Sequence, residues 1–289
     1  MIKLRSASIG APYTFDNTSQ KQIVNEYLRI TRSILEKENL LEQIYADANI
    51  TNKELGSKSV REELATLYPR QTELAPLAEA ILQGQVSQVL AENGLTAIGQ
   101  TVPNVWYHST PLPMALIVSP RDHIEQIANI SVDTNLPLDE QAALESSVDK
   151  GLNTSSLVVG IGGVGVYPTM VMQTTDLKWV LSTVAHEWTH NYLTLRPLGM
   201  LYGETPELRT MNETTASITG NEIGTLVVKR FYPELIRASR SNPDLVFAPF
   251  NLSQPELFAP PPFDFRAEMN KTRVTTDALL AEGKIKEAE

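Results

Sequence analysis

Apolar residues recur at helical spacing through the first third of the chain. The pattern predicts three helices, over residues 19–47, 52–67 and 71–91, with a break at Pro69 between the second and the third. No reactive group of side chains stands out in this part of the chain. We therefore expect residues 1–95 to form a helical layer that serves as a scaffold or lid.

After the helical layer, the pattern changes to short apolar runs bounded by turn residues, which is typical of strands. The predicted strands cover residues 95–108, 114–120, 123–132, 156–161 and 166–173. A helix is predicted over 137–150, and a glycine turn joins the last two strands into a hairpin. The alternation of short strands and helices predicts a small mixed sheet covered by helices.

Two helical patterns follow the hairpin, over residues 174–195 and 206–230. The segment 242–262 is rich in proline and aromatic residues, and we interpret it as a wrapping loop or linker. A charged amphipathic helix is predicted from Phe265 onward. The apolar residues expected to pack this last helix are Met269, Val274, Leu279 and Leu280.

The helix predicted over 174–195 has an unusual polar face. Its apolar stripe comprises Leu177, Val180, Leu181, Val184, Trp188 and Leu195. Its opposite face, on which Trp179, Thr183, His186 and His190 lie, carries no Lys or Arg, whereas a surface helix is usually charged there. Thr174 or Thr175 is the expected N-cap. We therefore expect one face to lie in the core and the other to line a cleft.

The polar face contains the sequence His186-Glu187-Trp188-Thr189-His190, an H-E-x-x-H motif. Residues four apart lie one above the other on a helix, so both imidazoles can reach one metal ion. Glu187 lies on the flank of that face, where it can act on a water molecule at the metal without being a ligand. The motif predicts a metal site on this helix.

A zinc site with two histidines needs a third protein ligand and an open position. Glu213 is the first choice, because Ser217, Gly220 and Gly224 follow it on the same helix face and permit close approach of another helix. The weaker candidates are Glu204, Glu207 and Glu222, and His108 and His123 lie far upstream.

At this point the chain resembles the gluzincin zinc metallopeptidases, in which H-E-x-x-H on one helix is joined by an N-E-x-x-[AS] glutamate on the next. The resemblance covers about 159–230 and includes Asn212 and Glu213. It implies zinc on His186 and His190 together with Glu213, and Glu187 as the general base. Members often carry an acidic residue four positions after the glutamate ligand, where this chain has Ser217.

The resemblance also implies a Tyr or His that stabilises the oxyanion. Tyr202 is the first choice, with Tyr192 and Tyr167 behind it. Aminopeptidases of this kind hold the substrate amine with an acidic residue near the strand before the histidine helix. Because residues 151–175 contain no Asp or Glu, an endopeptidase is favoured over an aminopeptidase.

Composition narrows the remaining possibilities. The chain has 289 residues, 42% of them hydrophobic, and a net charge of −10, which disfavours nucleic acid and anionic membranes as partners. It contains no cysteine, which excludes disulfides and thiolate ligands. No transmembrane segment or export signal is expected, and the compartment and oligomeric state stay open.

The glycines at 160, 162 and 165 spell the dinucleotide fingerprint G-x-G-x-x-G. That fingerprint needs a helix immediately after it, and here a strand-like run follows, so nucleotide binding is not expected.

These observations together predict an α+β protein with a zincin-like catalytic domain. The expected boundaries are 1–95 for the helical layer, 96–232 for the metal-binding core, and 233–289 for the wrapping segment with the last helix. The predicted function is zinc-dependent cleavage of a peptide or protein substrate, with the strand over 167–173 available to pair with the substrate backbone. The alternative is a zincin-like scaffold that binds a partner without catalysis.

Overall fold

The computed structural model describes residues 15–47, 49–50, 52–97, 99–134, 136–236 and 265–288. The chain is an α+β protein, as predicted, with two small three-stranded sheets. It divides into two compact units: Met1–Pro111 with Gly162–Ala248, and Leu112–Ile161 with Pro249–Glu289. These units do not follow the predicted boundaries at residues 95 and 232. The helical layer shares a unit with the H-E-x-x-H helix, and the predicted wrapping segment 242–262 lies outside the described residues.

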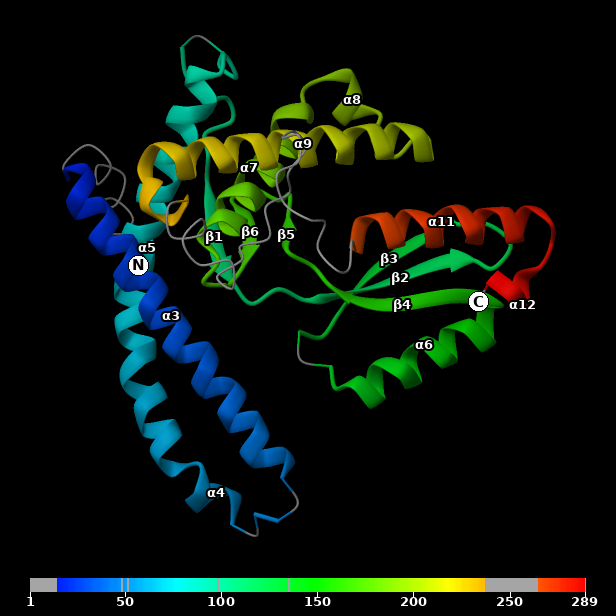
Figure 1. The fold of residues 1–289 in the computed structure, drawn as a ribbon, viewed down its shortest axis with the longest axis horizontal. Helices are drawn as coiled ribbons and strands as arrows, with labels where there is room; N and C mark the ends of the chain where they lie inside the picture. Colours follow the sequence, from blue (N-terminus) through cyan, green and yellow to red (C-terminus); the bar gives the residue numbers. More distant parts are fainter. Residues whose placement is uncertain are drawn as a thin grey trace, which may run out of the picture. The chain divides into compact units, whose positions relative to one another are not determined.

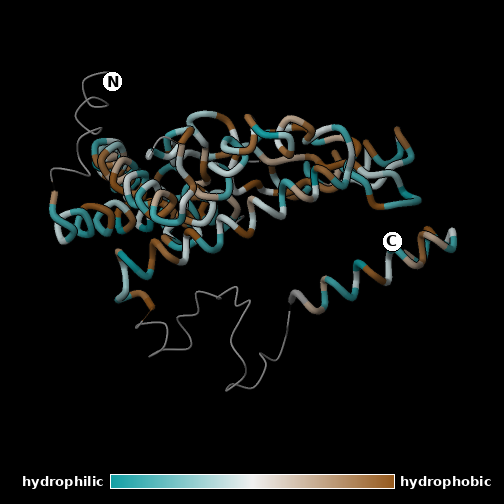
Figure 2. The backbone as a smooth tube through the Cα atoms, turned by 90° about the horizontal axis from the view of Figure 1, so that it is seen from above, coloured by the Kyte–Doolittle hydropathy of each residue, from teal (hydrophilic) through white to brown (hydrophobic). Residues whose placement is uncertain are grey.

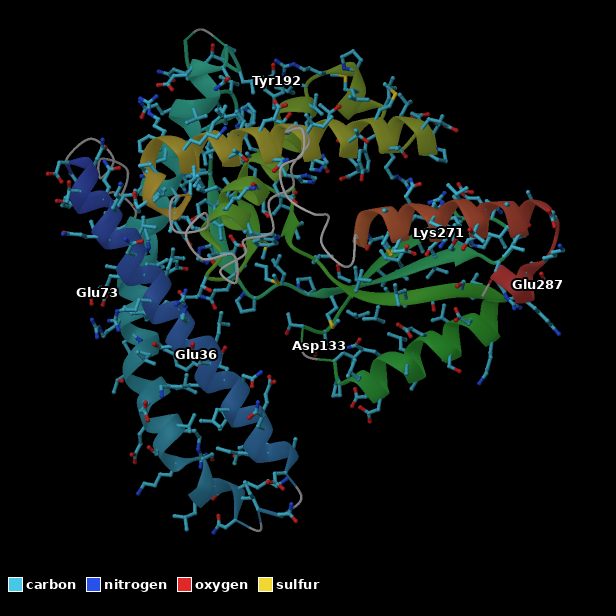
Figure 3. The ribbon with its side chains drawn as sticks, in the orientation of Figure 1. Glu36, Glu73, Asp133, Tyr192, Lys271 and Glu287 are labelled. Atoms are coloured by element: carbon cyan, nitrogen blue, oxygen red, sulfur yellow. The ribbon has the colours of Figure 1, made fainter. Side chains whose placement is uncertain are left out.

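In the first unit, a helical hairpin carries the N-terminal part of the chain (Figure 1). Helix α3 (Asn17–Ala46) leads through the short α4 (Lys53–Gly56) into α5 (Lys58–Glu92), which runs back alongside α3. Hydrophobic and hydrophilic residues alternate along the helices (Figure 2). Glu36 on α3 and Glu73 on α5 are exposed to solvent (Figure 3).

The prediction that Pro69 separates two helices is wrong, since α5 continues through both Pro69 and Pro76. An interior proline removes one helical hydrogen bond and costs about 3 kcal/mol. Packing of α5 against α3 offsets this cost, because Ile30 and Ile34 share a buried cluster with Leu64 and other α5 residues. Across the same contact, the Gln71 side chain donates a hydrogen bond to the Thr31 hydroxyl at 2.9 Å.

The sheet of the first unit has the strand order β1-β6-β5. Strand β6 (Thr169–Met172) pairs in parallel with β1 (Tyr107–Thr110) and antiparallel with β5 (Gly163–Val164). The predicted strand over 95–108 is therefore almost entirely loop, and only its last two residues lie in β1. Because β6 is paired on both sides, the prediction that this strand pairs with a substrate is wrong. The outer strand on that side is β5.

Helices α7 (Leu177–Leu193) and α9 (Pro206–Phe231) cross in close contact, joined by the short α8 (Pro197–Met200) (Figure 1). Helix α7 begins later than predicted, because Asp176 is its N-cap and accepts a hydrogen bond from the Trp179 N–H at 2.9 Å. The predicted cap of α9, Thr205, accepts one from the Leu208 N–H.

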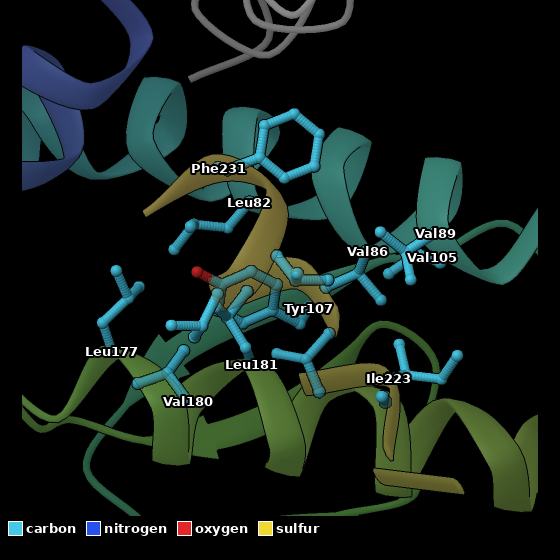
Figure 4. Packing of buried hydrophobic residues seen from close by; sticks show 14 of the residues in the cluster. Leu82, Val86, Val89, Val105, Tyr107, Leu177, Val180, Leu181, Ile223 and Phe231 are labelled. Atoms are coloured by element: carbon cyan, nitrogen blue, oxygen red, sulfur yellow. The ribbon is translucent and has the colours of Figure 1, made fainter. Parts of the chain in front are cut away.

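The core of the first unit lies between the hairpin, the sheet and the two crossed helices. The apolar stripe of α7 contributes Leu177, Val180 and Leu181, which meet residues of α5 and Tyr107 of β1 (Figure 4). Each of these three α7 side chains is at most 6% exposed. The prediction that the apolar stripe of this helix packs in the core is therefore confirmed for these residues. This packing holds the helix that carries the histidines.

The second unit contains an antiparallel sheet of order β3-β2-β4. Its strands are β2 (Met114–Pro120), β3 (Ala128–Val132) and β4 (Thr154–Gly160), and α6 (Leu138–Leu152) packs Leu144 and Val148 against one face. The predicted hairpin of strands 156–161 and 166–173 does not form. Strand β4 pairs with β2 along its whole length, and β5 takes the place of β4 beside β6.

The same unit contains α11 (Phe265–Ala281) and α12 (Ile285–Ala288). Two residues expected to pack α11 are exposed, Met269 at 51% and Val274 at 61%, so that part of the prediction is wrong. Leu279 and Leu280 are half-buried. Among the described residues, no helix is long and apolar enough to cross a membrane.

Candidate metal centre

The two histidines of the motif face each other on α7. Their rings meet edge to face with centroids 4.8 Å apart, and the two Nε2 atoms are separated by 3.1 Å. Two imidazole nitrogens at this distance need a proton or a cation between them, since neutral lone pairs repel. The arrangement follows directly from the four-residue spacing of His186 and His190 on one helix face.

Glu213 reaches the same point from α9. Its Oε2 atom lies 3.6 Å from Nε2 of His186 and 3.5 Å from Nε2 of His190. The helices approach closely enough because Gly220 has no side chain: a Cβ there would lie 2.6 Å from the carbonyl oxygen of Ser182. The prediction of close packing through small residues is therefore confirmed for Gly220 and Gly224, whereas Ser217 is exposed.

The three atoms fit the requirements of a tetrahedral metal ion. Bonds of about 2.0–2.1 Å at tetrahedral angles place neighbouring ligand atoms about 3.3 Å apart. The observed separations of 3.1, 3.5 and 3.6 Å bracket this value. Two imidazoles and one carboxylate are also a donor set that zinc accepts, and all three side chains are partly exposed, so water or a substrate can reach the fourth position.

Asn212 orients one of the histidines, a role that the sequence analysis missed. Its Oδ1 atom accepts a hydrogen bond from Nδ1 of His190 at 2.7 Å, while its amide nitrogen donates to the carbonyl oxygen of Leu198. The amide is therefore fixed with its oxygen toward the imidazole, which puts the proton on Nδ1 and leaves Nε2 free to bind a metal. The sequence feature that could have indicated this contact is the position of Asn212 directly before Glu213. Ser217, which stands where members of the resembled family carry an acidic residue, is exposed.

Glu187 lies beside the three ligand atoms without being one of them. It is only 8% exposed, under the backbone of β5. Burial raises the pKa of its carboxyl above the ordinary value, although the imidazoles of His186 and His190 act in the opposite direction. By contrast, the same two imidazoles hold the pKa of the Glu213 carboxyl well below its ordinary value. The site thus contains one carboxylate suited to bind a cation and one better suited to accept a proton.

Tyr202 lies beside Glu213, and its hydroxyl donates a hydrogen bond to Oε1 of Glu213 at 2.7 Å. Its ring also meets the His190 ring at 6.3 Å between centroids. Burial, and then the contact with the Glu213 carboxylate, raises the pKa of Tyr202 to about 12, so the hydroxyl keeps its proton. The group it binds is the carboxylate of the third candidate ligand.

The other candidates have different surroundings. His108 pairs with Glu79 of α5 at 3.0 Å, and His123, in the second unit, pairs with Asp122 and Glu125. Glu204, Glu207 and Glu222 are exposed, Tyr192 stacks on Trp188, and Tyr167 meets Trp106. Within the described part of the chain, one group of three or more His, Asp or Glu side chains could hold a metal ion. It consists of His186, His190 and Glu213.

Comparisons with protein-family models, with curated proteins and with solved structures find no match to this chain.

Proposed function

We propose that this chain is a zinc-dependent peptidase of the gluzincin type, with a zincin-like fold formed by the β1-β6-β5 sheet, α7 and α9. The observation that carries the proposal is the convergence of three ligand atoms from His186, His190 and Glu213, within 4.8 Å of one another, beside the buried carboxylate of Glu187. A purely structural metal site is usually closed by four protein ligands, whereas a catalytic one keeps a position open.

Bound zinc would supply a Lewis acid that polarises a carbonyl group and lowers the pKa of its water. The chain's own residues supply the rest of the chemistry. Glu187 takes the proton of the attacking water and passes it to the leaving amine, a task for which a raised pKa is suited. Asn212 keeps the tautomer of His190 in which Nε2 is a ligand.

A peptide substrate is supported by the position of β5. This outer strand of the sheet lies directly over Glu187, and an extended backbone can pair with such an edge. The segment 151–175 supplies no acidic residue to hold a free amine, which favours an endopeptidase.

The test is metal analysis together with hydrolysis of a peptide library by the full chain. We expect about one zinc per chain, a sharp loss of zinc in Glu213→Ala, and little change in the matched control Glu222→Ala, because Glu222 is exposed on the same helix. Equal zinc affinity in the two variants would contradict the ligand assignment. Full zinc occupancy without any peptide turnover would favour the alternative, a scaffold that binds a partner.

A further inference from the structure

The glycines around β5 differ in what lies next to them. A Cβ at Gly163 would lie 2.6 Å from Oε1, 2.8 Å from Cγ and 2.9 Å from Cδ of Glu187. One at Gly165 would lie 3.2 Å from Oε2 of Glu187 and 3.4 Å from Cβ of His190. At Gly160, a Cβ would meet nothing within 4 Å. The backbone at Gly163 therefore lies directly against the Glu187 side chain and leaves no room for a Cβ, whereas the contact at Gly165 is tight but less close.

Strand β5 cannot move aside to make that room. It is paired with β6 through Gly163 with Val171 and Val164 with Met170, and the Met172 N–H donates to the carbonyl oxygen of Gly162 at 2.9 Å. Val171 is fully buried, and β6 is paired with β1 on its other side. We therefore expect a side chain added at Gly163 to displace the end of the Glu187 side chain rather than the paired backbone of the strand.

We propose that Gly163, supported by Gly165, is a positioning residue for Glu187: the bare backbone of β5 holds the carboxylate at the place from which it takes the proton of the attacking water. The inference rests on the proposed function. It also gives the glycine-rich run a role other than phosphate binding. Gly165 is followed by a bend and β6, not by the helix N-terminus that a pyrophosphate site needs.

The first part of the test compares Gly163→Ala with the matched control Gly160→Ala in the zinc-loaded full chain. Displacement of a reacting group by about 1 Å can cost about 10²-fold in rate, so we expect kcat of Gly163→Ala to fall by that order. Zinc affinity should stay unchanged because Glu187 is not a ligand, and KM should change little because alanine keeps the backbone groups of β5 with which a substrate can pair. Gly160→Ala should match the wild type. A Gly163→Ala variant with wild-type kcat would overturn the proposal.

The second part asks whether the added methyl group and the carboxylate compete for the same volume. Glu187→Ala removes Oε1, Cγ and Cδ, the three atoms that a Cβ at position 163 would meet. The double variant Gly163→Ala with Glu187→Ala should therefore have a kcat close to that of Glu187→Ala alone, about 10²-fold above the value expected if the two single losses multiplied. Losses that simply multiply would contradict direct competition and overturn the inference.

The third part is independent of catalysis. In the metal-free chain labelled with 13C at glutamate carboxyls, the Glu187 resonance is identified by its absence from Glu187→Gln. We expect this resonance to shift in Gly163→Ala and to stay in place in Gly160→Ala. If the wild type hydrolyses no peptide, the proposed function fails while this resonance still decides the positioning role. An unmoved resonance would overturn the positioning role, whatever the activity.

Discussion

At the scale of single residues, the candidate centre depends on the residues that contact its three candidate ligands. Asn212 directs Nε2 of His190 to the site, and Tyr202 binds the oxygen of Glu213 that does not face the histidines. Such outer contacts fix the orientation of ligands and typically change metal affinity by about 10–100-fold when they are removed. Glu187 differs from all of these residues, because its carboxylate lies beside the ligands and is not one of them.

Replacing Glu187 separates metal binding from chemistry. Glu187→Gln is nearly isosteric but cannot accept a proton, so we expect zinc content to stay at the wild-type level while kcat falls by at least about 10²-fold. Metal analysis and peptide hydrolysis on the same preparation check this. Near wild-type hydrolysis by the variant would show that another group is the base.

Replacing the Tyr202 hydroxyl distinguishes its two roles. Tyr202→Phe removes the hydrogen bond to Oε1 of Glu213, so we expect the zinc dissociation constant to rise by about tenfold in a chelator competition. If Tyr202 also stabilises the oxyanion, as predicted from the sequence, the kcat of the variant falls by about 10²-fold even at saturating zinc. Unchanged zinc affinity would contradict the first role, and unchanged kcat at saturating zinc the second.

At the scale of elements, the site is the product of one helix crossing. Helix α7 carries the histidines and Glu187, α9 carries Asn212 and Glu213, and β5 covers the base. Glycine inside a helix costs about 1 kcal/mol relative to alanine, and α9 contains two at the crossing, Gly220 and Gly224. The close packing of the two helices at these glycines offsets this cost.

Gly220→Leu should therefore disrupt the site without changing any ligand. Its Cβ would overlap the carbonyl oxygen of Ser182 and approach Cβ of His186 to 2.9 Å, and neither can rotate away. We expect zinc affinity to fall by at least about tenfold and stability to fall by about 1–3 kcal/mol. The control is Glu222→Leu, which adds the same side chain at an exposed position of α9. Equal zinc binding by the two variants would contradict the role of the crossing.

At the scale of the whole molecule, the three candidate ligands come from two helices packed into one core together with the N-terminal hairpin and the sheet. A metal that binds both α7 and α9 in the folded state, and not in the unfolded chain, stabilises the first unit. The three candidate ligands all lie in the first unit, and the described residues of the second unit, with its separate sheet and the α6 cluster, are not among them.

Removal of zinc with a chelator should therefore lower the melting temperature of the first unit. At a free zinc concentration of about 100 times the dissociation constant, binding contributes about 2.7 kcal/mol, which corresponds to a shift of about 5–10 °C for a unit of this size. Calorimetry with and without zinc measures it. His190→Ala, which lacks a ligand, should melt at the same temperature in both conditions, and a shift as large as that of the wild type would contradict binding at this site.

The sequence by itself determined the features that depend on neighbours along the chain. The helix over 206–230, the strand over 114–120 and the convergence of His186 and His190 follow from local periodicity, so each was predicted close to its observed place. Glu213 was also within reach of the sequence, because the small residues that follow it on one helix face indicate a close helix contact.

Only the tertiary structure decided what depends on partners far away in the chain. The continuity of α5 through Pro69 is set by packing against α3, and the outer position of β5 is set by the pairing of β6 with β1. The contact of Asn212 with His190 and that of Gly163 with Glu187 join segments more than twenty residues apart. Periodicity and propensity describe one segment at a time, so they carry no information on which segments contact one another. The free energy of these tertiary contacts decides the features that the local pattern leaves open.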